Sequence, residues 1–166
     1  MRKTFYLIAA AGFAATSAHA SGVPINDQVK LKQLDRAFEM AAAELKTVTV
    51  IYEDQCPDEK PASCSFHGQG QLQILGAADS IDSAPTSITL IYTPDGDPNP
   101  FVLNVGLLVS VAEPGMPQDD RAKIITSIVR IAGGQEKGPI VEGRNAAFSV
   151  TDILGSIWVV AEKAAN

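Results

Sequence analysis

The chain has 166 residues, of which 46% are hydrophobic and 19% are charged, and its formal net charge at pH 7 is -6. This is the size of one ordinary domain, with enough apolar material for one core. An acidic chain without a run of lysine or arginine argues against nucleic acid as a partner and against adhesion to an anionic membrane, because both surfaces are negatively charged.

The first twenty residues have the organisation of an export signal. A basic pair follows the first methionine, an apolar run covers 5–15, and Ala18–Ala20 supplies the small-residue pattern that signal peptidase recognises. The apolar run is too short for a membrane-spanning helix. We therefore expect 1–20 to be a cleaved signal peptide and 21–166 to form a single domain. The mature protein is then periplasmic or secreted, without membrane insertion after cleavage.

The first predicted element after the signal is an amphipathic helix over about 26–45. Asn26 or Asp27 can cap its amino terminus. Its apolar positions recur every three or four residues, which predicts one face packed on a sheet. These positions are Leu31, Leu34, Phe38, Ala41, Ala42 and Leu45.

A disulfide-bonded hairpin is predicted next. Residues 47–52 are mostly β-branched or aromatic, and 66–75 alternate between polar and apolar positions, so both segments favour strands. Cys56 and Cys64 lie between them, separated by seven residues that include two prolines. In an oxidising compartment such a pair closes a small loop. We expect a hairpin over about 47–75, with the disulfide at its tip.

Two further strands and a second helix follow in the pattern. Residues 87–92 favour a third strand, and the long apolar run 101–111 predicts a buried central strand. A helix is predicted over about 117–132, because its proline suits the first helical position and Asp119 and Asp120 suit the positive end of the helix dipole.

The last part of the chain allows two alternatives. Residues 146–151 and 156–160 are rich in strand-forming residues and favour two short strands. Residues 153–165 also have apolar spacing compatible with a closing helix. With strands here, the order of elements predicts an α+β fold. We expect a two-layer domain, with an antiparallel sheet of about six strands and two helices packed on one face.

The densest acidic patch surrounds Cys56, close to the sole histidine after the signal. A rigid acidic loop closed by a disulfide is pre-organised to dock into a basic groove of another protein. The alternative is a solvated surface without a partner. The residues of this candidate interaction loop are Glu53, Asp54, Asp58, Glu59 and His67.

No pattern assigns a catalytic, cofactor or metal site. His67 lies near serines and acids, but no nucleophile motif accompanies it. Asp95, Asp97 and Asn99 have the 1, 3, 5 spacing of a calcium loop, but other residues occupy the later glycine and glutamate positions of that motif. We therefore expect no cofactor and no metal.

The sequence predicts an exported, non-enzymatic protein that binds another envelope or extracellular protein, as an inhibitor or as an assembly or secretion accessory. One alternative is a carrier of a small apolar molecule or lipid, held between the sheet and the helices, with Val105–Val111 and the second helix lining the pocket. A third hypothesis is a small hydrolase that uses carboxylates.

Overall fold

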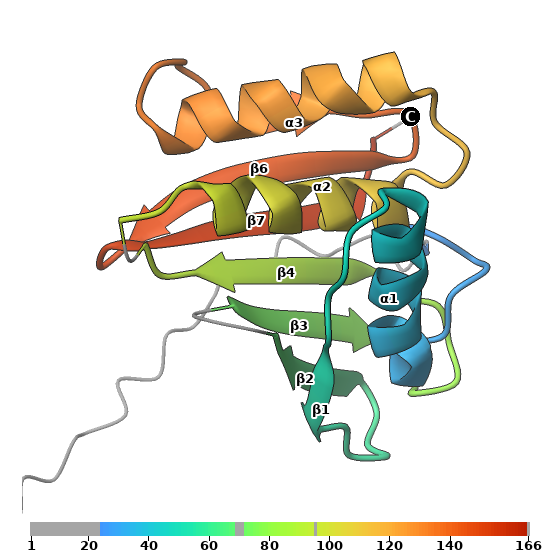
Figure 1. The fold of residues 1–166 in the computed structure, drawn as a ribbon. Coiled ribbons are helices and arrows are strands. Elements are labelled where there is room, and N and C mark those ends of the chain that lie inside the picture. The colour runs from blue at the N-terminus through green and yellow to red at the C-terminus, as the bar shows by residue number, and fades with distance from the viewer. Residues whose placement is uncertain (1–23, 69–71, 95, 166) are drawn as a thin grey trace, which may run out of the picture.

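The computed structural model describes residues 24–68, 72–94 and 96–165. These residues form one antiparallel sheet and a layer of helices packed on one of its faces (Figure 1). Across the sheet, the strand order is β1 (Tyr52–Gln55), β2 (Ala62–His67), β3 (Leu72–Ala78), β4 (Ser87–Tyr92), β7 (Ser156–Lys163), β6 (Ala146–Ile153) and β5 (Ile140–Glu142). The predicted α+β class is confirmed, with seven strands where about six were expected.

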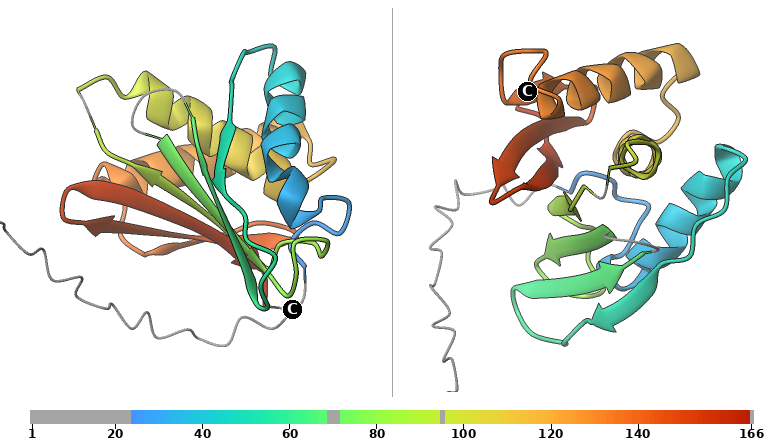
Figure 2. Two further views of the ribbon diagram at one scale, coloured as in Figure 1. Left: turned by 90° about the horizontal axis from the view of Figure 1, so that it is seen from below. Right: turned by 60° about the vertical axis from the view of Figure 1, so that its left-hand side comes forward.

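Three α-helices form the second layer. They are α1 (Leu34–Glu44), which follows one turn of 3-10 helix, η1 (Leu31–Gln33), and then α2 (Asn99–Ala112) and α3 (Gln118–Ala132). They lie on the same side of the sheet, and α2 lies between the other two (Figures 1 and 2). Within the described ranges, no helix is both long and apolar enough to cross a membrane.

The hydrophobic core lies between the two layers. Because successive side chains of a strand point to opposite faces, alternate residues of the central strands are buried against the helices. Phe66, Ile74 and Leu90 belong to this set, and α1 contributes Leu34 and Phe38. The opposite sheet face carries half-buried side chains, and no described helix covers it.

The apolar run 101–111, predicted as a strand, is instead most of α2. This helix is buried on nearly every side. The sheet lies below it, and the side chains of Leu45 and Ile125 lie 3.6 and 3.7 Å from the position that a Cβ on Gly106 would take. A helix that is apolar all round has no stripe to reveal its period, so its pattern resembles that of a buried strand. The prolines at its start were the missed helix signal.

The predicted hairpin over 47–75 is also corrected. Its first strand begins only at Tyr52, and the preceding segment is a connection in which Val48 is 84% exposed. The segment 66–75 belongs to two strands, β2 and β3, rather than one. In the sequence, the polar–apolar alternation continues in phase from the first of these strands into the second, which hides the break. The hairpin that carries the disulfide is therefore β1–β2.

The tail strands follow the predictions, whereas the first helix begins later than predicted. The strands expected in the tail are β6 and β7, so the closing-helix alternative is wrong. The first helical segment begins at Leu31 rather than near 26, with Lys30 at the N-cap position, so neither Asn26 nor Asp27 caps it. The Nδ2 atom of Asn26 instead donates to the carbonyl oxygen of Val111 at 2.8 Å, which ties this segment to α2.

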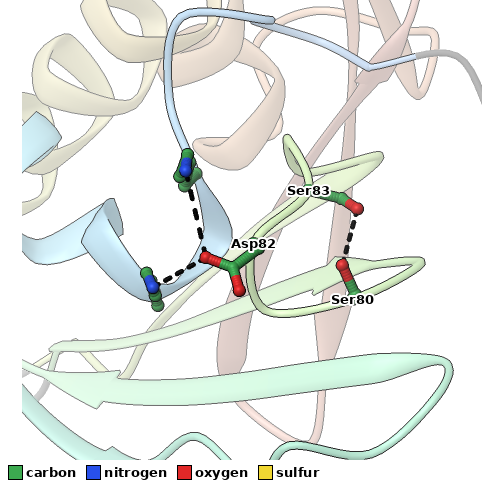
Figure 3. Close-up of polar contacts among 5 residues, drawn as sticks. Ser80, Asp82 and Ser83 are labelled. Carbon is green, nitrogen blue, oxygen red and sulfur yellow. Dashed lines mark hydrogen bonds and ion pairs between the residues drawn. The ribbon is translucent and has the colours of Figure 1, made fainter.

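The connection between β3 and β4 packs against the first helical turns (Figure 3). Its Asp82 carboxylate lies 2.7 Å from the Lys32 ammonium and 3.9 Å from that of Lys30. The hydrogen bond from Lys32 and its positive charge hold the pKa of Asp82 below its ordinary value. In the same connection the hydroxyl groups of Ser80 and Ser83 are hydrogen-bonded at 2.7 Å.

Candidate functional site: the disulfide-bonded hairpin

The β1–β2 hairpin forms one edge of the sheet, at the side away from α3 (Figure 1). All four residues of β1 are exposed, and the strand pairs with β2 through Tyr52 opposite His67 and Glu53 opposite Phe66. The register shifts after Glu53, which marks a bulge. A short, acidic and irregular edge strand resists pairing with strands of other molecules. The surface that β1 offers to a partner therefore consists of its side chains.

The disulfide predicted between Cys56 and Cys64 is present. Cys56 directly follows β1, whereas Cys64 lies within β2 and is fully buried in the core. The bond therefore fastens the loop 57–61 to the body of the domain. This arrangement limits the freedom of the exposed loop relative to the sheet.

Asp54 and His67, two residues of the predicted interaction loop, contact each other directly. His67 Nδ1 lies 2.5 Å from Asp54 Oδ1, and both side chains are nearly half exposed. The ring of Tyr52 stacks on the imidazole with centroids 5.2 Å apart and planes 26° apart. The sequence analysis missed Tyr52, and only the strand register places it opposite His67.

The other three acidic residues of the loop point into solvent. Glu53, Asp58 and Glu59 are exposed, and none forms an ion pair within the part of the chain that the structure describes. Lys60 is the one lysine in the hairpin, against four carboxylates. The end of the hairpin is therefore a concentrated negative surface held on a fixed backbone.

The geometry does not favour hydrolysis at His67. Within the described ranges, its polar partner is Asp54, and no serine hydroxyl lies within hydrogen-bond distance of its ring. General-base activation of a nucleophile needs such a contact. Both side chains of the pair are also open to water, which screens their mutual attraction.

The comparisons with known proteins give no relative. No protein-family model matches the chain, and no curated protein or solved structure matches it significantly.

Of the three residues with calcium-loop spacing, the two in the described ranges contact each other within the fold. Asp97 Oδ1 accepts the backbone N–H of Asn99 at 3.0 Å at the start of α2, and Asp95 lies outside the described residues. Across the described ranges, no group of three or more His, Cys, Asp or Glu side chains is arranged to hold a metal ion.

Within Val105–Val111, the segment expected to line a pocket, Ser110 and Val111 contribute to one of about 550 Å³ beside α1. All residues of this segment belong to α2, and each of them is buried among the sheet and the neighbouring helices. Two residues of the second predicted helix, Val129 and Ala132 of α3, line a different pocket, which lies at the other end of α2, beside Phe101.

One buried carboxylate was not anticipated from the sequence. Glu113, at the end of α2, is 0% exposed and accepts hydrogen bonds from the backbone N–H groups of Asn145 at 2.8 Å and Ala146 at 2.9 Å. The Asn145 side chain adds a third bond at 3.1 Å. These contacts fasten the helical layer to the start of β6, which is a structural role.

Proposed function

We propose that the mature protein is an exported, non-enzymatic protein that binds another envelope or extracellular protein through the end of the β1–β2 hairpin. It acts as an inhibitor or as an assembly or secretion accessory. The observation that carries this proposal is the set of carboxylates presented on an exposed hairpin that a disulfide fastens to the core. Because the backbone is already ordered, binding costs less conformational entropy there than on a free loop.

The chemistry of the hairpin indicates a basic partner surface. Glu53, Asp58 and Glu59 have no cation of their own among the described residues, so a partner's lysine or arginine side chains can approach them. Such rim charges act mainly on the rate of association and on specificity, and salt screens them. Tyr52, which is 54% exposed, adds an aromatic surface of the kind enriched at interfaces.

The proposed compartment has one structural support. A disulfide in the folded domain is compatible with an oxidising environment such as the periplasm or the cell exterior. The signal-like pattern in 1–20 points to the same compartment.

Capture from an envelope extract tests the proposal when two charge-matched variants are compared. The first variant is Glu53→Gln, Asp58→Asn and Glu59→Gln combined. The second removes three exposed carboxylates elsewhere, as Glu39→Gln, Glu142→Gln and Glu162→Gln combined. We expect a partner that the wild type and the second variant retain and the first variant loses. Equal retention by all three proteins would remove the hairpin from the proposal.

A further inference from the structure

A pocket of about 360 Å³ opens where β4 passes into α2, at the left-hand end of the molecule in Figure 1. Tyr92 and Phe101 are its most buried members, at 3% and 5% exposed, and their rings lie 5.4 Å apart in a tilted arrangement. Val129 and Ala132 from the last turn of α3 and Ile157 from the start of β7 complete its apolar lining. Four separate elements, β4, α2, α3 and β7, thus converge on one concave apolar surface.

The polar groups at this pocket are already engaged with each other. The Tyr92 hydroxyl donates to the backbone carbonyl of Asp97 at 2.9 Å. The Asp97 carboxylate accepts the N–H of Asn99 at 3.0 Å. A molecule in the pocket would therefore meet mostly ring and aliphatic surface.

A hydrogen bond at the rim joins two walls of the pocket. The hydroxyl groups of Thr93 and Ser156 are hydrogen-bonded at 2.9 Å, which joins the end of β4 to the start of β7. Each of these residues directly precedes a residue that lines the pocket, Pro94 or Ile157. A ligand does not have to order these walls when it binds. Small-molecule sites are usually preformed in this way.

The charge of the lining selects among ligands. Asp97 is a lining residue, and no lysine, arginine or histidine is among the lining residues. A carboxylate or sulfonate group would have to lose its hydration there without a positive partner. The volume lies near the lower end of the usual range for small-molecule pockets, about 300 to 1,000 Å³.

We propose that this pocket binds a small, uncharged apolar molecule of about the size of a compound with two or three aromatic rings. The proposal does not depend on the hairpin contact, because it involves none of the residues of the β1–β2 hairpin.

Fluorescence titration with two related probes tests it on the mature protein. N-phenyl-1-naphthylamine is neutral, and 8-anilinonaphthalene-1-sulfonate is a closely similar molecule with a negative charge. We expect saturable binding of the neutral probe, one molecule per chain, and binding of the sulfonate that is at least about tenfold weaker, because its charge is not compensated. No saturable binding of the neutral probe, or equal binding of both probes, would overturn the proposal.

Matched variants locate the bound probe. Ala132→Phe fills the pocket from the half-exposed face of α3, and Ala122→Phe makes the same change at an exposed position near the other end of that helix. Val129→Gln makes the lining polar with a residue that helices tolerate, so it serves if Ala132→Phe does not fold. We expect Ala132→Phe and Val129→Gln to weaken binding of the neutral probe about tenfold or more, with Ala122→Phe unchanged. Unchanged binding in both pocket variants would place the probe elsewhere and contradict the assignment.

Discussion

Asp54 and His67 face each other across the first two strands, with 2.5 Å between Oδ1 and Nδ1. The disulfide joins the same two strands nearer the connecting loop, between the residue after β1 and the middle of β2. β1 is therefore joined to β2 at two places along the hairpin, while the acidic side chains of the hairpin remain exposed. A surface of this kind can bind a partner without first becoming ordered.

The disulfide should contribute substantially to stability. We expect Cys56→Ser to lower the free energy of unfolding by roughly 2.5 kcal/mol, because the open loop gains conformational freedom in the unfolded chain. Urea unfolding under non-reducing conditions measures this difference, with Ser63→Ala as a neighbouring surface control. A loss within about 0.5 kcal/mol, the usual range for surface substitutions, would show that the bond does not constrain the unfolded chain.

Gly143 should tolerate no side chain. A Cβ atom there would lie 2.2 Å from the Oε1 atom of Glu113 and would displace the carboxylate from its hydrogen bonds with Asn145 and Ala146. We expect Gly143→Ala to destabilise the fold by at least about 2 kcal/mol in urea unfolding, because a buried carboxylate loses its donors.

The same substitution at Gly106 is the matched control. Its Cβ would meet Leu45 and Ile125 at ordinary contact distances inside α2. Alanine is the better helix former, so we expect Gly106→Ala to be neutral or stabilising by up to about 1 kcal/mol. Equal destabilisation by both substitutions would contradict the role assigned to the close approach of Glu113.

Lys32 should stabilise the fold in a pH-dependent way. Its hydrogen bond and charge lower the pKa of Asp82 in the folded protein (Figure 3). A lowered carboxyl pKa stabilises the folded state above the unfolded pKa, and this contribution is lost as the pH falls through the folded-state pKa. We expect Lys32→Met to lower the melting temperature slightly at pH 7 and not at all once Asp82 is protonated.

Thermal melts from pH 7 down into the acid range check this prediction. Lys137→Met removes the same charge from a lysine that has no ion pair within the described residues, so it serves as the control. A Lys32→Met effect that persists unchanged at low pH would have to come from packing rather than from the charge.

The turn between β6 and β7 should be improved by asparagine. Ile153 pairs with Ser156 around a two-residue turn in which Leu154 and Gly155 have φ values of 54° and 83°. Leucine is disfavoured in this left-handed conformation, and its side chain is 97% exposed. Asn-Gly is the preferred pair for such a turn, so we expect Leu154→Asn to stabilise the protein by about 0.5 to 1 kcal/mol.

Leu154→Ala separates the two effects in that turn. It removes the exposed apolar side chain but keeps a residue that disfavours positive φ, so we expect little change in the free energy of unfolding. A gain from Leu154→Ala as large as that from Leu154→Asn would contradict the conformational explanation.

The sequence alone predicted the elements whose hydrophobic pattern has a clear period. Residues 87–92 alternate because one face is buried under the helices and the other is open, so their strand was predicted correctly. The stripe around Leu34 and Phe38 likewise identified the first helix. The hydrophobic pattern did not identify the helix at 101–111, because burial on nearly all sides removes the period that distinguishes a helix from a strand.

The candidate site could be predicted only in part. The spacing and the prolines identified Cys56–Cys64 as a pair, because that inference is local. The contact of Asp54 with His67 and the stacking of Tyr52 depend on which residues of two strands lie opposite, including the bulge after Glu53. Strand register is set by the hydrophobic pattern and by the geometry of the connecting loop, and the bulge after Glu53 shifts it in a way that the sequence does not show.

Site-specific photo-crosslinking in cells that produce the protein tests the proposed contact most directly. A photoreactive amino acid is placed at Glu59 in the exposed loop and, in a separate variant, at Glu142 in β5 on the opposite edge of the sheet. We expect a discrete adduct with one other protein from Glu59 and none from Glu142. No adduct from Glu59, or the same adducts from both positions, would contradict a partner bound at the disulfide-bonded hairpin.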